Sequence, residues 1–261
     1  MHALLDQSTD LTSVIGTMDA VDLETLDTAL LHDRVESKVV LRSDAIPGVL
    51  RRLHDDYFVL EHNASRLQGY RTEYFDSAGL RNYHEHHNQR RMRLKVRYRS
   101  YLSSCSTFFE VKRNVDGRTV KDRRRSRQPG GRLWHDDAEF FNGLTGWDPD
   151  LLVPSLTVDY ERILLVKRDL TERVTIDLGM RFHGRGCATQ AEALAICEFK
   201  QPAMDQHSPA MAAVQQRPRK FSKYCMGLAS CDPSLKRNRF KQNFLALDSL
   251  GAPIVTEAVA A

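Results

Sequence analysis

The sequence predicts an α+β fold that is mainly antiparallel β, organised as a closed barrel with helices packed outside. Many short segments alternate between polar and apolar residues with a period of two, which is the pattern of strands that bury one face. These segments recur at even spacing and few helical segments separate them, which favours antiparallel hairpins over a parallel α/β sheet. A chain of 261 residues is long enough to bury the core of one such barrel.

The composition is that of a globular protein, with 41% hydrophobic and 28% charged residues. The formal net charge is only +4, but basic residues crowd the stretch from Arg90 to Arg132. Five cysteines without a CxxC pair argue against a disulfide framework and against a structural zinc site. Because the N-terminus lacks a basic signal region and no apolar run reaches the length of a membrane span, we expect a cytoplasmic protein with no membrane insertion of its own.

The chain is expected to hold one main domain between two terminal segments. Residues 1–17 lack a clear period and predict a loose leader, whereas Met18–Leu31 carries an apolar stripe typical of a short helix. Together they give an N-terminal leader and helix over residues 1–31, followed by the main domain over residues 32–230. Residues 231–261 are expected to form a C-terminal tail that frays from Asp248 onward.

Within the main domain the expected elements follow in a regular order. Strand patterns occupy residues 34–41, 69–76, 91–101, 106–123, 156–168, 172–182 and 193–200, with a hairpin turn at Asn114–Gly117. Helices are expected at Ala45–Leu53, at Leu133–Leu144 and in a region that begins near Ser208. The segment "RRRSRQPGGR", residues 123–132, predicts a basic loop and is the best candidate for disorder.

The strand pattern "RMRLKVRYRSY" has one face that is wholly cationic. Arg93, Lys95, Arg97 and Arg99 alternate with mostly apolar residues, and residues two apart in a strand share a face. Four like charges along one strand face repel each other. The pattern therefore predicts an anion that neutralises them.

Other strands repeat this division between a charged and an apolar face. Their charged faces hold Glu36 with Lys38, Glu110 with Lys112, Arg173 with Thr175 and Asp177, and Glu198 with Lys200. One arrangement puts these faces outside, in solvent, and for any single strand that arrangement is the more common one. The other lines the lumen of the barrel with them. Repetition over five strands favours the lumen, where the cations need bound anions or paired carboxylates; such a lumen suits a polyanion and a divalent metal.

An ordered set of short motifs resembles one known family. "VESK", "YFDS", "LKVRYRSY", "FFEVKR", "VDYER", "RVTID", "CEFK" and "FSKY" occur in an order that is similar to the VTC domain, the polyphosphate polymerase branch of the triphosphate tunnel metalloenzymes. The resemblance covers roughly residues 35–228. It implies a closed tunnel barrel of about eight strands, whose basic walls bind triphosphate or polyphosphate and whose acids bind a divalent cation.

The resemblance also implies roles for individual residues. Phosphate-binding wall residues with a catalytic role would be Lys38, Arg97, Arg99, Lys112, Arg162, Arg173, Lys200 and Lys223. Further substrate contacts are expected from Arg93, Lys95, Tyr74 and Ser222. Glu198 would be the leading metal ligand, with Glu36 and Glu110 beside it, for Mn²⁺ or Mg²⁺.

The implied activity is transfer of the terminal phosphoryl of ATP onto a polyphosphate chain. The sibling CYTH branch has a Glu-x-Glu-x-Lys pattern in its first strand, and Arg34 replaces the first of those glutamates here, which fits the VTC branch better. The alternatives are a triphosphatase or polyphosphatase of the same fold and a non-catalytic polyphosphate sensor. Nucleic acid is not an expected partner, because the charged face has no interleaved aromatic residues to stack bases. Relatives work beside membrane proteins, so a membrane-protein partner is possible; the sequence does not give the oligomeric state.

Overall fold

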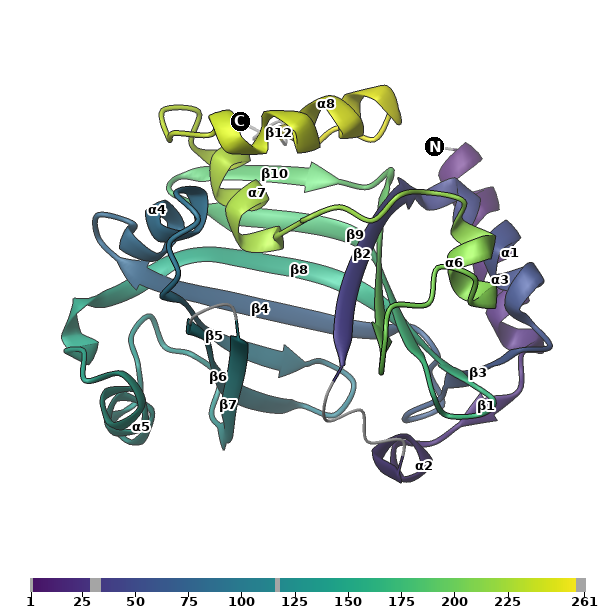
Figure 1. The fold of residues 1–261 in the computed structure, drawn as a ribbon, viewed down its shortest axis with the longest axis horizontal. Coiled ribbons are helices and arrows are strands. Elements are labelled where there is room, and N and C mark those ends of the chain that lie inside the picture. Colours follow the sequence, from purple (N-terminus) through teal and green to yellow (C-terminus); the bar gives the residue numbers. More distant parts are fainter. Residues whose placement is uncertain (1, 29–33, 116–117, 257–261) are drawn as a thin grey trace.

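One antiparallel sheet forms the centre of the computed structural model, which describes residues 2–28, 34–115 and 118–256 (Figure 1). Eight strands pair in the order β7, β6, β5, β4, β8, β9, β11, β2. Their bounds are β2 Val35–Arg42, β4 Gln68–Ser77, β5 Arg93–Tyr101, β6 Ser106–Val115, β7 Arg118–Ser126, β8 Leu152–Lys167, β9 Arg173–Gly184 and β11 Leu194–Gln201. The expected mainly antiparallel α+β class is confirmed.

The expected closed barrel is wrong, because the sheet is open between its first and last strands. In the described parts of the chain, β2 pairs only with β11, and β7 pairs only with β6. An alternating pattern decides which side chains share a face, but barrel closure also depends on strand tilt and stagger, which the pattern does not contain. Side chains cross the gap instead: Lys112 Nζ on β6 lies 3.4 Å from Glu36 Oε2 on β2.

Four short strands extend this sheet. They are β1 Ala20–Val21, β3 Tyr57–Leu60, β10 Cys187–Ala191 and β12 Val255–Thr256. One edge of strand β9 pairs with two strands in succession, and its other edge pairs with β8. Residues 173–177 pair with β11, and residues 180–184 pair with β10. Gly179 lies between the two halves with a φ of +58°, a backbone conformation that glycine adopts without strain.

Helices cover the apolar side of the sheet. Helices α1 (His2–Thr17), α3 (Ile46–Leu53) and α6 (Pro209–Val214) lie against β2, β9 and β11, where Leu50 packs with Ile176 and Phe199 in one buried cluster. Helix α5 (His135–Thr145) places Phe141 against Phe109 on β6. Helices therefore cover these apolar faces, as expected, but the open sheet does not close around a barrel lumen.

Helix α7 (Lys223–Cys231) packs on the opposite side of the sheet, over β8 and β9 (Figure 1). A Cβ atom on Gly227 would collide with the side chains of Phe182 and Leu156, so only glycine permits this close approach. Asp76, at the end of β4, anchors the same region: it accepts hydrogen bonds from the backbone of Tyr83 in α4 (Arg81–His87) and from the hydroxyl of Tyr224 in α7.

Several expectations for single segments are wrong. The expected loose leader contains α1, and the expected helix Met18–Leu31 is β1 followed by α2 (Leu23–Thr28), with residues 29–33 outside the described part. Strand β7 runs through Ser126, into the expected basic loop, because its cross-strand partner β6 orders it. The expected fraying tail contains the end of α8 (Lys241–Ser249) and β12, and residues 257–261 lie outside the described part.

Three 3₁₀ helices complete the described chain: η1 Ser43–Ala45, η2 Pro149–Leu151 and η3 Asn238–Phe240. The predicted helices at Ala45–Leu53 and Leu133–Leu144 are confirmed as α3 and α5, and the helical region from Ser208 is confirmed as α6 and α7. None of the helices over residues 2–28, 34–115 and 118–256 is both long and apolar enough to cross a bilayer.

Candidate functional site

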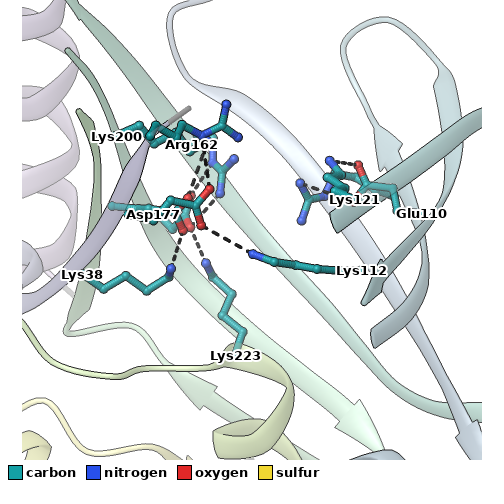
Figure 2. A network of polar contacts seen from close by, with 12 residues as sticks. Lys38, Glu110, Lys112, Lys121, Arg162, Asp177, Lys200 and Lys223 are labelled. Carbon is teal, nitrogen blue, oxygen red and sulfur yellow. Dashed lines mark hydrogen bonds and ion pairs between the residues drawn. The ribbon is translucent and has the colours of Figure 1, made fainter. Parts of the chain in front are cut away.

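Charged side chains from seven strands and α7 converge on the side of the sheet opposite the outer helices (Figure 2). We call this set the cationic network. Its members are Glu36 and Lys38 on β2, Arg97 and Arg99 on β5, Glu110 and Lys112 on β6, Lys121 on β7, Arg162 on β8, Asp177 on β9, Glu198 and Lys200 on β11, and Lys223 on α7. Eight cations thus face four carboxylates.

Glu110 organises one part of the network. Its Oε2 lies 2.6 Å from a terminal guanidinium nitrogen of Arg97 and 3.8 Å from one of Arg99, and its Oε1 lies 2.6 Å from Nζ of Lys121. Only 1% of the Glu110 side chain is exposed. Burial alone would raise its pKa, but Arg99, Arg97 and Lys121 outweigh burial and hold the pKa well below its usual range.

Asp177 organises a second part. Arg162 donates Nε to Oδ1 at 2.5 Å and Nη2 to Oδ2 at 2.9 Å, and Lys223 donates to Oδ2 from the first residue of α7. Burial raises the pKa of Asp177, yet Arg162 and Lys223 lower it to about 2. The carboxylate therefore stays ionised and fixes two cations from different elements.

Glu198 and Glu36 form the third part, on the neighbouring strands β11 and β2. Lys38 lies 2.8 Å and Lys200 3.5 Å from Glu198, while Lys112 approaches Glu36 across the open edge. Burial raises the pKa of Glu198, but Lys38 and Lys200 hold it well below its usual range. Burial and the Glu198 charge raise the pKa of Glu36, and the surrounding lysines leave it below its ordinary value.

Several buried polar groups of the network region have no hydrogen-bond partner among the described residues. Nε of Arg99 and Oγ1 of Thr72 face each other across the β4–β5 pair, and Oγ1 of Thr175 lies on the β9 face that holds Asp177. Buried polar groups without partners are rare, and each costs free energy unless a ligand or water satisfies it. Together with the excess of cations, these groups indicate that the surface is built to receive an anion with several oxygens.

The other predicted substrate contacts lie around the network. Lys95 donates to Oγ of Ser222 at 3.1 Å, and Arg97 donates to the hydroxyl of Tyr74, also at 3.1 Å. Ser222 caps α7 by accepting from the Cys225 backbone N–H. Burial and, to a smaller extent, the nearby cations Lys112, Arg97 and Lys38 lower the pKa of Lys95 to about 8. The half-buried ammonium thus lacks a carboxylate partner in the described structure.

Arg93 and Arg173 lie at the margins of the predicted set. Arg93 begins β5, opposite Asn114, and continues the cationic face of that strand. Arg173 begins β9, opposite Lys200, and its guanidinium donates to the carbonyl of Leu26 in α2. Arg173 therefore ties the N-terminal segment to the edge of the network.

Lys121 and Asp177 belong to the network but were not among the predicted site residues. Lys121 shares a strand face with Thr119 and pairs directly with Lys112, so the alternation in "RTVKDR" carried the signal. Asp177 shares a face with Thr175 and Arg173 in the sequence pattern. What the pattern does not show is that Asp177 meets Arg162, because that contact depends on which strands are neighbours.

The carboxylates of the network differ in how well they could hold a divalent cation. In the described ranges, no group of three or more His, Cys, Asp or Glu residues is placed to hold a metal by itself. Glu36 and Glu198 do fit a partial site, since they lie diagonally across the β2–β11 pair and interact electrostatically. Magnesium typically uses one or two carboxylates and completes its shell with water and substrate phosphates. Glu110 fits less well, because only 1% of its side chain is exposed, compared with 20% for Glu198 and 27% for Glu36.

Comparison with known proteins agrees with the motifs. The family model described as "VTC domain" matches residues 33–130 and 139–231. A search of curated proteins gives no match to this chain. Among solved structures, a proposed adenylate cyclase from Bacillus halodurans has 11% sequence identity and a TM-score of 0.48, and the match covers 73% of this chain and 95% of that one.

Two further solved structures are similar over much of their length. A proposed adenylyl cyclase from Hippeastrum, described as having a dominant triphosphatase activity, has 10% identity and a TM-score of 0.41 over 87% of this chain and 92% of that one. A protein from Pyrococcus horikoshii has 11% identity and a TM-score of 0.36 over 87% and 95%. At these identities and TM-scores, the likenesses carry no weight for activity. The family match spans more than half of the sequence and the motifs lie within it, so the chain belongs to the VTC domain family.

Proposed function

We propose that this chain is a metal-dependent polyphosphate polymerase that transfers the terminal phosphoryl of ATP onto a polyphosphate chain. The observation that carries the proposal is the excess of cations in the network, fixed by four carboxylates and joined across the open edge of the sheet by Lys112 and Glu36. Phosphoryl transfer needs positioning and charge neutralisation more than a covalent nucleophile, because charge in the transition state is spread over the equatorial oxygens.

Each part of the network has a role in this proposal. Arg97, Arg99 and Arg162 bind phosphate oxygens through their planar guanidinium groups, whereas Lys38 and Lys223 act as mobile point charges. Glu110 and Asp177 position those cations. No general base is assigned, because the attacking end of a polyphosphate chain is already an ionised phosphate. That oxygen attacks the γ-phosphorus of ATP, the bond to ADP breaks, and the chain gains one phosphoryl group.

Mn²⁺ or Mg²⁺ is the proposed cofactor, held by Glu198 and Glu36. When bound there, a divalent cation would neutralise phosphate charge and orient the triphosphate. Lys38 and Lys200, which contact Glu198, are the proposed phosphate-binding residues beside this carboxylate. For Glu110 we propose a positioning role in place of metal binding, since its side chain is almost fully buried between Arg97 and Lys121.

A triphosphatase or polyphosphatase is the second candidate. The same cationic surface would present water in place of a phosphate chain to the γ-phosphorus, so its residues serve either reaction. A sensor that binds polyphosphate without catalysis is the third. A nucleic-acid module is disfavoured, because Tyr70, Tyr74 and Tyr160, which lie on the network side of the sheet, are buried and unavailable to stack bases.

The test is to incubate purified protein with ATP and Mn²⁺, with and without a short polyphosphate primer, and to quantify ADP, free phosphate and chain length. Glu198→Gln is the matched variant, since it keeps the shape of the side chain and removes its charge. Longer chains with equal amounts of ADP, lost in the variant or with a chelator, support the polymerase. Free phosphate without chains identifies a hydrolase. If neither chains nor free phosphate form, the protein binds polyphosphate without catalysis.

A further inference from the structure

We propose that the edge strand β7 carries a second anion-binding site, which holds the distal part of a long polyphosphate chain outside the cationic network. We call it the β7 arginine row: Arg123 and Arg125 on the strand, and Arg127 directly after its end. The inference rests on the proposed function for the identity of its ligand, but not for the existence of the row.

The row continues from the network along one strand face. Lys121, Arg123 and Arg125 lie directly opposite Lys112, Glu110 and Phe108 of β6, and directly paired residues share a face. The six steps of extended backbone from Lys121 to Arg127 span about 20 Å. A chain whose end is bound in the network can therefore extend along β7, whereas a tripolyphosphate is too short to occupy both places.

The arginines of the row are exposed and have no carboxylate partner in the described parts of the chain. Arg124, on the opposite face of the same strand, differs: it lies 3.4 Å from Asp136 and 3.5 Å from Asp137. Asp136 and Asp137, the acids beside the end of β7, are thus already paired with Arg124. Adjacent like charges on one strand face repel each other, and a bound polyanion removes that repulsion.

Two of the arginines lie over aromatic rings. Cζ of Arg123 lies 5.1 Å from the ring centre of Phe108, and Cζ of Arg127 lies 5.0 Å from that of Trp134. A stacked guanidinium keeps its N–H edge available and loses less freedom when it binds phosphate. Each ring already has an arginine over it, which makes it less available to stack nucleobases. The row therefore favours a polyphosphate over a single-stranded nucleic acid.

A hollow lies at the far end of the row. It has a volume of about 300 Å³ and is lined by residues that include Arg125, Arg127 and Trp134. Asp137, also in its lining, is buried and accepts hydrogen bonds from Tyr98 and Ser126, so it is part of the scaffold. Arg124, Ser126 and Asp136 complete the lining, so the row leads from the network to a recess lined by three arginines and two aspartates.

The experiment measures binding of long-chain polyphosphate and of tripolyphosphate to the full chain by titration calorimetry, without ATP. The test variant replaces Arg123, Arg125 and Arg127 by serine. A matched control replaces Arg51, Arg181 and Arg185, exposed arginines of α3, β9 and the β9–β10 turn, and so removes the same charge elsewhere. We expect the test variant to weaken long-chain binding about tenfold or more and to flatten its salt dependence, with tripolyphosphate binding unchanged.

Two additional arms keep the result decisive. If the triple variant does not fold, Arg125→Ser alone, at an exposed side chain, replaces it and should give a smaller loss of long-chain affinity. Lysine at all three positions should restore part of the long-chain affinity. Equal long-chain binding by the test variant and the control overturns the row. Equally tight binding of single-stranded DNA to the unmodified protein overturns the preference for polyphosphate. Tripolyphosphate binding by Arg162→Ala tests the cationic network and not the β7 arginine row. The proposed function and the row can therefore be contradicted independently.

Discussion

Arg162 and Asp177 face each other as direct partners on β8 and β9, and the guanidinium contacts both carboxylate oxygens, at 2.5 and 2.9 Å. The Asp177 side chain is only 2% exposed. Lys223 shares the same carboxylate from α7. One buried acid therefore keeps two cations of different elements within reach of a common ligand.

Asp177→Asn should lower the free energy of unfolding by about 3 kcal/mol, because it leaves Arg162 and Lys223 buried without their counter-charge. Chemical denaturation measures the loss. Asp159→Asn is the matched control, since Arg71 contacts both oxygens of Asp159 but is 58% exposed. That change should cost less than about 1 kcal/mol. Equal losses in the two variants would contradict the role assigned to Asp177.

The Arg162–Asp177 pair makes the stability of the fold depend on pH. The folded-state pKa of Asp177 is lowered from 3.8 to about 2, so its stabilising contribution is complete above pH 3.8 and is lost as the pH falls through 2. Denaturation curves between pH 5 and pH 2 should therefore fall less steeply for Asp177→Asn than for the unmodified protein. Parallel curves would show that the carboxylate has an ordinary pKa.

Glu110→Gln should lower kcat about a hundredfold without raising KM. The amide no longer fixes the guanidinium groups of Arg97 and Arg99, which reduces their stabilisation of the transition state, whereas the added net positive charge favours triphosphate binding. Steady-state kinetics separate the two effects. Asp122→Asn, which disturbs an ion pair with Arg113 on the other face of β7, is the control. A rise in KM with unchanged kcat would assign Glu110 to ground-state binding alone.

Tripolyphosphate binding at pH 8 should take up protons. The pKa of Lys95 is lowered from 10.5 to about 8, so about half of these ammonium groups are neutral at that pH, and an anion favours the charged form. Calorimetry in buffers of different ionisation enthalpy should detect the uptake, and Lys95→Met should reduce it. Lys167→Met, at a lysine paired with Asp169, should not. Without ligand, the lowered pKa of Lys95 destabilises the fold at low pH. As the pH rises from 8 to 10.5, the cost of burying a charged Lys95 disappears and the free energy of unfolding increases.

Gly227→Ala should destabilise the fold by about 1–3 kcal/mol, because the new Cβ would meet Phe182 and Leu156 and force α7 away from the sheet. Lys223 and Ser222 would move with the helix, so tripolyphosphate affinity should fall as well. Gly143→Ala in α5 is the control, since its Cβ would meet no atom within 4 Å. That change should be neutral or slightly stabilising. The prediction fails if thermal unfolding and affinity respond alike to both changes.

The alternation in the sequence predicted which side chains share a strand face, but not which strands lie next to each other. Alternation placed Lys38, Arg97, Lys112 and Glu198 on charged faces, and each lies in the network because the opposite, apolar faces are covered by helices. Whether β2 and β7 would meet depends on tilt and stagger, and the open edge between them was not predictable from periodicity. The domain limits at residues 31 and 231 stay predictions.

Contacts between distant segments explain most of the errors in the predictions. Lys121 follows the alternation of β7, yet its role depends on the placement of Glu110 across the β6–β7 pair. Helix α1 shows little local signal, and Ile15 at its end is ordered by burial in the same cluster as Leu50 of α3. Propensity alone does not predict such segments, since tertiary packing supplies most of their stability.

The most direct measurement follows the γ-phosphoryl group of radiolabelled ATP incubated with the protein, Mn²⁺ and a short polyphosphate primer. We predict that the label enters chains of increasing length, with one ADP formed for each phosphoryl incorporated, and that Lys38→Met and Glu198→Gln abolish the incorporation. Label recovered only as free phosphate, or incorporation that persists in both variants, would contradict the assignment of the cationic network as a polyphosphate polymerase site.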